Sequence, residues 1–242
     1  MKILNLGCGV KTSSSPDVVN LDWSIYLRLR RNPVLRILAL RLLKGQRLER
    51  FKSLPANILV HDLSKGIPFP ADSIDVVYHS HMLEHLDREV AVSFLLEVKR
   101  VLRPGGVQRI VVPDFEYLCR AYLGHTAACE KGPDEVARHD EYIAAVIEQC
   151  VRRWGVGTAR EPPLGRFFEK LVLGDARSKG ETHRWMYDRF NLAALLTRLG
   201  FRTLRLQSYD VSMVPNWSQY GLDLNAAGNE YIPGSLYFEA QK

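Results

Sequence analysis

The chain has 242 residues, of which 46% are hydrophobic and 25% are charged, so one α/β domain can bury a full core without metal or disulfide support. Its cysteines, Cys8, Cys119, Cys129 and Cys150, show no paired metal-ligand spacing, and the N-terminus carries no apolar signal run. No segment approaches the ~18 consecutive apolar residues of a membrane span. These features favour a reducing, cytoplasmic setting.

The net charge of +6 is unevenly distributed along the chain. Residues 28–52 hold nine Lys and Arg residues against one acid, Glu49, and the basic residues alternate with leucine and isoleucine. A basic amphipathic segment of this kind can lie on an anionic membrane surface or hold an acidic substrate. Packing of its apolar side against the core is the alternative that we favour. Because this stretch is not an aromatic-studded groove, we do not expect nucleic acid as a partner.

Short apolar runs rich in β-branched residues predict seven strands, at residues 3–6, 17–21, 57–60, 74–78, 107–112, 201–209 and 235–240. Helical periodicity predicts two short helices within 25–52 and single helices at 90–102, 135–154 and 189–199. Strands that alternate with helices indicate a mainly parallel sheet covered on both faces. We expect one domain over residues 1–242. Its segment 115–188 is too long for a single crossover and predicts an inserted helical cap.

A glycine turn and two acids stand at the ends of the first three expected strands. Gly7-Cys8-Gly9 follows the first strand, Asp22 ends the second and Asp62 follows the third. In an open parallel sheet, ligands bind outside the carboxyl ends of the strands, where the strand order reverses. Glycines let a ligand approach the backbone closely, and an acid at the next strand end can accept both hydroxyls of a ribose. Together these features predict a nucleotide-type cofactor site.

Six segments in order resemble the successive motifs of class I S-adenosylmethionine-dependent methyltransferases of the short-loop, type 11-like subgroup. They are Leu4-Asn5-Leu6-Gly7-Cys8-Gly9, Asn20-Leu21-Asp22, His61-Asp62-Leu63, the stretch 69–77, Met82-Leu83-Glu84-His85-Leu86 and Leu102-Arg103-Pro104-Gly105-Gly106. The resemblance spans roughly residues 1–114 and the closing helix and strands. It implies a Rossmann-like, doubly wound seven-stranded sheet whose last strand is antiparallel. The chain departs from the family pattern in lacking the third loop glycine and in joining the first two strands by residues 7–16 alone, too few for a crossover helix.

The resemblance implies that S-adenosylmethionine is the cofactor and S-adenosylhomocysteine the product. Gly7 and Gly9 would pass under the amino acid end of the cofactor, Asp22 would hold its ribose, and Asp62 with Leu63 would flank the adenine. The expected cofactor-binding residues are Leu6, Gly7, Cys8, Gly9, Asp22, Asp62, Leu63, His79, Ser80 and His85. A nicotinamide dehydrogenase would share the sheet and the acid, but it needs neither the Leu-Glu-His-Leu nor the Leu-Arg-Pro-Gly-Gly motif.

The segment His81-Met82-Leu83-Glu84-His85 also fits the H-x-x-E-H pattern of zinc proteases. That pattern needs a helix already formed at His81, so that both histidines share one face. Because the segment follows a strand, we expect no metal there. We expect Glu84 to cap the start of the following helix.

Methyl transfer to a hydroxyl needs a base, and a histidine suits that task near neutral pH. His183 is the first candidate because it lies in a dense polar and aromatic segment between cap and fold; His81 and Asp114 follow. The expected acceptor contacts are Arg184, Trp185, Tyr187 and Tyr117. Core packing of Trp185 and Tyr187 is the alternative, and Asp188 is expected to cap the next helix.

The function that we favour is O-methylation of a sugar or another polar metabolite, by analogy with similar predicted methyltransferases. N-methylation of a small molecule is one alternative. A catalytically idle, cofactor-binding partner subunit that docks through residues 25–52 is another. The partner that we expect is a small-molecule acceptor, and homodimer formation and a membrane contact through residues 25–52 stay open.

Overall fold

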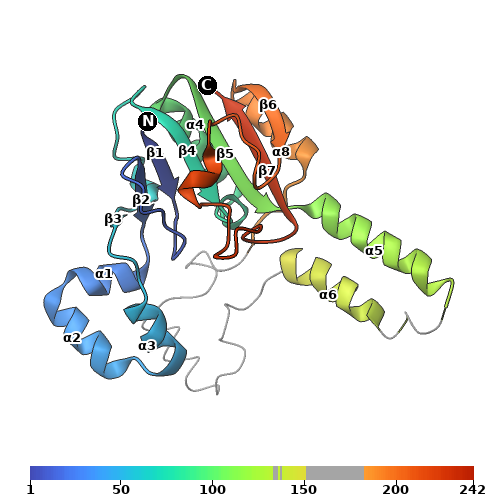
Figure 1. Cartoon of the computed structure of the whole chain (residues 1–242), viewed down its shortest axis with the longest axis horizontal. Coiled ribbons are helices and arrows are strands. Elements are labelled where there is room, and N and C mark those ends of the chain that lie inside the picture. The colour runs from blue at the N-terminus through green and yellow to red at the C-terminus, as the bar shows by residue number, and fades with distance from the viewer. Residues whose placement is uncertain (133–135, 137, 151–182) are drawn as a thin grey trace.

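The computed structural model describes residues 1–132, 136, 138–150 and 183–242, and its described strands form one seven-stranded sheet in the order β3-β2-β1-β4-β5-β7-β6 (Figure 1). The strands are β1 (Ile3–Leu6), β2 (Val18–Asp22), β3 (Ile58–Val60), β4 (Ile74–Ser80), β5 (Leu102–Pro113), β6 (Arg202–Gln207) and β7 (Ser235–Gln241). β7 runs antiparallel to both of its neighbours, and the pairs among β1 to β5 are parallel. The predicted Rossmann-like sheet with an antiparallel last strand is confirmed.

The described helices are α1 (Ile25–Arg31), α2 (Pro33–Leu42), α3 (Gly45–Lys52), α4 (Arg88–Val101), α5 (Phe115–Cys129), α6 (His139–Cys150) and α8 (Arg189–Arg198). Residues 25–52 thus form three helices where two were expected. Asn32 separates the first two, because its side chain caps α2 and Pro33 fixes the first residue of that helix. α6 lies within the expected helix 135–154, of which residues 135, 137 and 151–154 lie outside the described residues. The rest of the segment 151–182, within the expected cap, also lies outside them.

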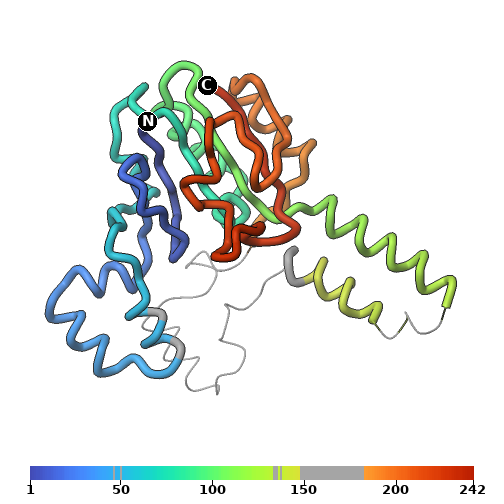
Figure 2. The backbone as a smooth tube through the Cα atoms, viewed as in Figure 1, coloured from blue at the N-terminus to red at the C-terminus, as the bar shows by residue number. Residues whose placement is uncertain are grey.

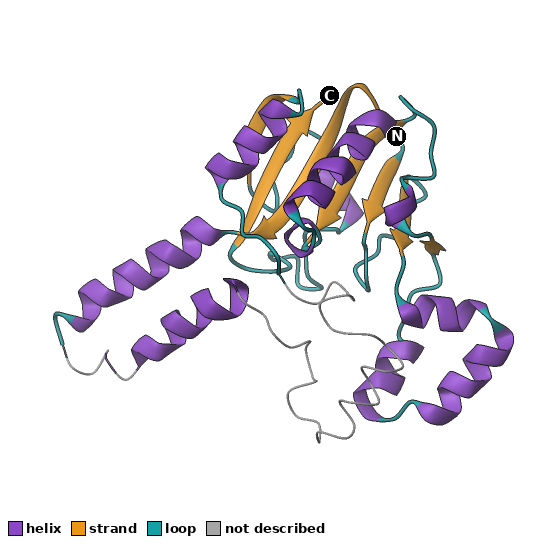
Figure 3. Ribbon diagram, turned by 180° about the vertical axis from the view of Figure 1, so that it is seen from behind, coloured by secondary structure: helices purple, strands orange, loops and turns teal. Residues whose placement is uncertain are grey.

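One face of the sheet is covered by α4 and α8 (Figure 3). Both helices bury apolar side chains against the strands, among them Leu95 and Val98 of α4 and Leu192 of α8. Asp188 caps α8 as predicted, since its carboxylate accepts hydrogen bonds from the N–H groups of Phe190 and Asn191.

The other face of the sheet is covered by the connection between β6 and β7, which contains one short 3-10 helix, η5 (Trp217–Tyr220) (Figure 2, orange to red). Its buried side chains, including Trp217, Tyr220 and Leu222, pack on Tyr78 and other residues of the strands. The two faces are therefore covered as expected, but one of them is covered by irregular chain.

Arg109 of β5 holds the connection between β6 and β7 against the sheet through ion pairs and hydrogen bonds. The guanidinium has no exposed surface and pairs with Asp223 at 2.8 Å and Glu239 at 2.9 Å. It also donates to the carbonyls of Ser208 and Val211, at the start of the connection. Paired carboxylates and carbonyl acceptors let this charge stay buried.

Buried asparagines replace the missing crossover helix between β1 and β2. The side-chain amide of Asn5 donates to Asn20 at 3.0 Å, and Asn20 in turn donates to the carbonyl of Ser13 at 2.9 Å. Asn57, next to β3, donates to the same carbonyl at 2.8 Å. These bonds fix the connecting loop without secondary structure of its own.

Two helical units project from the sheet, α1 to α3 beside β2 and β3, and the antiparallel pair α5 and α6 beyond β5 (Figure 1). The first unit has a small core of its own around Leu27, Ala39, Phe51 and Leu54. Ala39 is the only residue of α2 in that core, while Val34, Ile37 and Leu42 are 73%, 56% and 68% exposed. The expectation that the apolar side of 25–52 packs on the core is therefore wrong for α2. None of the described helices is long and apolar enough to cross a membrane.

Candidate cofactor site

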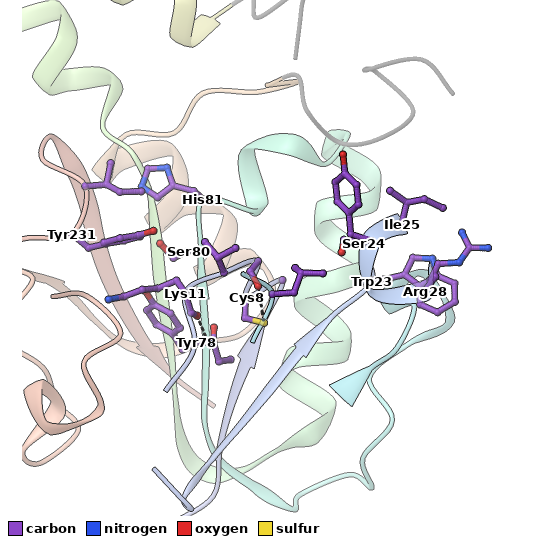
Figure 4. A pocket seen from close by; sticks show the side chains of 17 residues that line it. Cys8, Lys11, Trp23, Ser24, Ile25, Arg28, Tyr78, Ser80, His81 and Tyr231 are labelled. Carbon is purple, nitrogen blue, oxygen red and sulfur yellow. Dashed lines mark hydrogen bonds between the residues drawn. The ribbon is translucent and has the colours of Figure 1, made fainter. Parts of the chain in front are cut away.

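A cavity of about 620 Å³ lies at the carboxyl ends of β1 and β4, the pair of strands at which the strand order reverses (Figure 4). This is the place where open α/β sheets bind ligands, and the volume is that of a small-molecule pocket. The glycine turn, the residues after Asp22, Ser80, His81 and part of the connection between β6 and β7 line it.

The two glycines of the turn have different roles. Gly7 has φ +62°, and a Cβ atom there would lie 2.6 Å from Sδ of Met82, so a side chain would have to displace Met82 and adopt a left-handed backbone conformation. Gly9 has φ +54°, and a Cβ atom there would meet nothing within 4 Å. Gly7 leaves room for Met82, and Gly9 leaves the backbone open towards the cavity.

Asp22 holds the turn from the end of β2. Its carboxylate accepts the N–H of Gly9 at 2.8 Å. Burial raises the pKa of Asp22 above its ordinary value, although the N–H groups of Gly9, Ser24 and Trp23 act in the opposite direction. Burial, and then the charge of Asp22, raise the pKa of Cys8 to about 12, so this thiol is uncharged at neutral pH.

The cavity also contains residues that the sequence reasoning missed. Lys11 lies 4.4 Å above the ring of Tyr231 and donates to the carbonyl of Leu224, so it joins the turn to the connection between β6 and β7. Trp23 lines the cavity and stacks under Arg28 of α1, 4.8 Å away. The position of Trp23 directly after Asp22 could have indicated that it lines the cavity. No local signal placed Tyr231 beside Lys11.

Ser80, an expected cofactor residue, and His81, the second candidate base, line the cavity, but other expected cofactor residues, Asp22 and His85 among them, do not. His79 is completely buried, packs on Phe94 and has its pKa lowered to about 4 by burial. The expectation that its side chain binds cofactor is wrong, because neighbouring residues of a strand point to opposite faces. The side chain of Leu6 likewise lies in the core.

Asp62 and Leu63 lie beyond the end of β3 and do not line the cavity. The carboxylate of Asp62 accepts from the hydroxyl of Ser64 at 2.7 Å and from its N–H at 3.0 Å. The hydroxyl contact is the main reason that the pKa of Asp62 is lowered. A contact with adenine stays a prediction for both residues.

Glu84 is the centre of a cluster formed with His81, His85 and His183. Its Oε1 atom lies 3.3 Å from Nδ1 of His81, 3.9 Å from Nε2 of His85 and 4.0 Å from Nε2 of His183. The carboxyl group has no exposed surface. Burial alone would raise the pKa of Glu84, but contact with His81 and the charges of His81 and His85 hold it below its ordinary value. The predicted capping role is wrong, since α4 begins at Arg88 and Asp87 occupies its N-cap position.

The first candidate base, His183, is in this cluster but does not line the cavity; its side chain is 6% exposed. Its ring packs edge to face on His85, at 4.7 Å between centroids. Through Glu84 the structure brings His183 together with His81, which does line the cavity. The third candidate, Asp114, caps α5 by accepting the N–H of Glu116 at 3.0 Å, and burial raises its pKa.

The expected acceptor contacts lie away from the cavity. Tyr187 is buried in the core, which corrects the prediction and confirms its alternative, and burial raises its pKa to about 12. Trp185 lies under Arg88 of α4, 4.3 Å away, in a second hollow of about 340 Å³ between α4 and α8. Arg184 pairs with Asp87, and Tyr117 is exposed on α5.

Residues 4–110 match the family described as methyltransferase domain. This matched segment, which contains the glycine turn and Asp22, is a domain of the class I S-adenosylmethionine-dependent methyltransferases. Its cofactor is S-adenosylmethionine. A comparison of this chain with curated proteins found no match.

Several solved structures resemble this methyltransferase in fold. A methyltransferase from Methanosarcina mazei is 18% identical, with a TM-score of 0.44, and the match covers 100% of this chain and 92% of that one. One from Archaeoglobus fulgidus is 15% identical, with a TM-score of 0.42 and coverage of 100% and 86%. A phosphoethanolamine N-methyltransferase from Haemonchus contortus, in complex with S-adenosylmethionine, is 14% identical, with a TM-score of 0.42 and coverage of 100% and 48%.

The residues present fit the cofactor. Gly9 offers a backbone with no side chain over it, and Asp22 is an acid at the adjacent strand end. Trp23 supplies an aromatic face and Ser24 a polar group. Apolar walls with a few fixed polar groups are typical of a pocket that orients a small molecule.

Proposed function

We propose that the methyltransferase acts in the cytoplasm on a hydroxyl group of a sugar or another polar small molecule. The observation that supports this is the pair formed by His81 and Glu84. The ring of His81 lines the cavity, and its Nδ1 atom lies 3.3 Å from a carboxylate with no exposed surface. A carboxylate behind a histidine fixes the ring and stabilises the imidazolium that forms when the ring takes a proton.

In this proposal His81 replaces His183 as the base. With Nδ1 facing Glu84, the atom that accepts the proton is Nε2, which lies 2.9 Å from the hydroxyl oxygen of Ser235. In the proposed complex the acceptor hydroxyl replaces Ser235 as the partner of Nε2, and the hydroxyl of Ser235 keeps its bond to the carbonyl of Ile232 at 2.7 Å. His183 then supports Glu84 from 4.0 Å and does not touch the acceptor.

S-adenosylmethionine supplies a methyl group activated by its sulfonium. The protein's part is to place the acceptor in line with that group, exclude water and remove the proton. Polar and aromatic lining groups such as Ser80, Lys11 and Tyr231 suit an acceptor that carries several hydroxyls.

The test is transfer of a labelled methyl group to a panel of sugars and amines by the purified protein. His81→Gln should lower turnover with a sugar by about 100-fold or more, the usual contribution of a general base, with little change in cofactor affinity. His61→Gln is the control, because His61 bonds to the carbonyl of Gly66 and does not line the cavity. An unchanged rate in His81→Gln would remove that residue from the mechanism.

The same panel separates the alternatives. Transfer to amines that does not depend on His81 would favour N-methylation, which has less need of a base. Cofactor binding measured by calorimetry, with no transfer to any acceptor, would favour a catalytically idle partner subunit.

We also propose that α2 contacts an anionic membrane surface. Its exposed apolar residues Val34, Ile37 and Leu42 stand beside Arg36 and Arg41. Apolar side chains that enter the lipid boundary and basic ones that meet anionic headgroups together are typical of a helix lying in the interface.

A further inference from the structure

Three side chains of metal-binding type meet at the outer end of the hairpin formed by α5 and α6, away from the cofactor cavity (Figure 1). Nδ1 of His125 lies 3.1 Å from Nδ1 of His139. Sγ of Cys129 lies 3.5 Å from the first of these nitrogens and 3.8 Å from the second. All three potential ligand atoms therefore face one point.

The positions of these residues explain why spacing alone did not reveal them. His125 and Cys129 are four residues apart in the last turns of α5, so their side chains share one helix face. The third residue, His139, begins α6. The three residues come together only when the two helices lie side by side.

The distances agree with tetrahedral zinc coordination. With Zn–N near 2.0–2.1 Å and Zn–S near 2.3 Å, tetrahedral geometry separates two nitrogens by about 3.3 Å and sulfur from nitrogen by about 3.6 Å. The separations of 3.1, 3.5 and 3.8 Å lie within a few tenths of an ångström of these values. One thiolate with two imidazoles is also a donor set that favours zinc over calcium or magnesium.

The hairpin needs such a link because it has little apolar core. His125 is the only buried residue of α5, and none of residues 139–147 of α6 is buried. Leu123, Ile143 and Ile147 are 64%, 36% and 55% exposed. Helices of this length are marginal in water without packing, so a metal ion can supply what the apolar contacts do not.

A second group of potential ligands, Glu84, His85 and His183, is less suitable. Its carboxylate oxygen is 3.9 and 4.0 Å from the two imidazole nitrogens, and it lies nearer to His81, at 3.3 Å. In the proposed mechanism that carboxylate holds His81.

We propose that His125, Cys129 and His139 bind a zinc ion that joins α5 to α6, with water as the fourth ligand. Binding forms one Zn–S and two Zn–N bonds. The thiol of Cys129 gives up its proton to solvent, since the thiolate is the form that coordinates zinc.

Titration of the full-length, chelator-treated protein with Co²⁺ tests the proposal, followed by displacement with Zn²⁺. We expect one equivalent to bind with a thiolate-to-cobalt charge-transfer band. Cys129→Ser should abolish the band and weaken zinc binding at least 10-fold, and His139→Gln should weaken it likewise. Cys119→Ser, on the same helix and outside the group, is the matched control and should leave both unchanged.

Hydrogen exchange of the unmodified protein provides a measurement that does not depend on any variant. Zinc should protect the amides of α5 and α6 and leave those of the sheet unchanged. The absence of stoichiometric binding, or a band that persists in Cys129→Ser, would overturn the proposal. Protection centred on residues 81–85 would overturn it too, because the ion would then occupy the Glu84 group.

Discussion

The N–H group of Gly9 donates a hydrogen bond of 2.8 Å to the carboxylate of Asp22 and so joins the ends of β1 and β2. The resemblance to class I methyltransferases implies that the same carboxylate accepts the hydroxyls of the cofactor ribose. The ionised form is the stronger acceptor for both contacts, while burial raises the pKa of Asp22.

Cofactor affinity should consequently depend on pH. Asp22 takes up a proton as the pH falls through its raised pKa, so binding should weaken at a higher pH than an ordinary aspartate would cause. In calorimetry, Asp22→Asn should remove this pH dependence. At neutral pH, Asp22→Ala should weaken binding by about 1.5–3 kcal/mol, the scale of hydrogen bonds to a charged group. An affinity equal to that of the unmodified protein would contradict the assignment of Asp22.

The two glycines of the turn should respond differently to alanine. Gly7→Ala should destabilise the fold, because the new Cβ meets Sδ of Met82 at 2.6 Å and the backbone is left-handed. Gly9→Ala meets no atom within 4 Å and should cost only the left-handed strain, about 1–2 kcal/mol, but it should weaken cofactor binding. Urea unfolding with and without S-adenosylmethionine measures both effects. Equal losses of stability in the two variants would contradict this interpretation.

Removal of the buried Arg109 charge should be severely destabilising. Arg109→Met leaves Asp223 and Glu239 buried without their cation, which should lower the free energy of unfolding by about 3–5 kcal/mol. Arg103→Met is the control: Arg103 is 60% exposed and pairs with Asp75 at 2.8 Å, so its loss should cost about 1 kcal/mol or less. Similar changes in the two variants would show that the buried network does not hold the connection.

The membrane contact of α2 can be tested by flotation with vesicles. The protein should float with vesicles rich in phosphatidylserine and remain unbound with neutral ones. The double substitution Ile37→Ser and Leu42→Ser should abolish flotation. Leu206→Ser, which changes an exposed leucine of β6, should not. Flotation that survives the double substitution would contradict the proposal.

Local patterns predicted those features that depend on neighbouring residues. Runs of β-branched residues predicted the strands, and two closely spaced glycines predicted the turn. A short polar side chain before a helix predicted the cap formed by Asp188. Glu84 was misjudged because a glutamate before a helix resembles a cap. Its carboxylate faces His183, almost a hundred residues later in the chain, which no local pattern contains.

Other features of the site depend on contacts that no short pattern contains. Asn5 and Asn20 look like ordinary polar strand residues until the loop at Ser13 folds over them. Tyr231 reaches the cavity only because the connection between β6 and β7 crosses the sheet. In the same way, His125 and His139 meet only in the folded hairpin.

Tyr78 is part of both the cavity wall and the buried network around Arg109. Its ring lines the cavity, while its hydroxyl donates to Asp223 at 2.7 Å, a carboxylate that also neutralises Arg109. The segment that carries Asp223 also brings Tyr231 to the cavity wall. Substitutions that reshape this wall to change the acceptor preference should therefore also lower the free energy of unfolding. The evolution or engineering of new specificity should accordingly proceed through paired substitutions, one that alters the wall and one that restores the core beneath it.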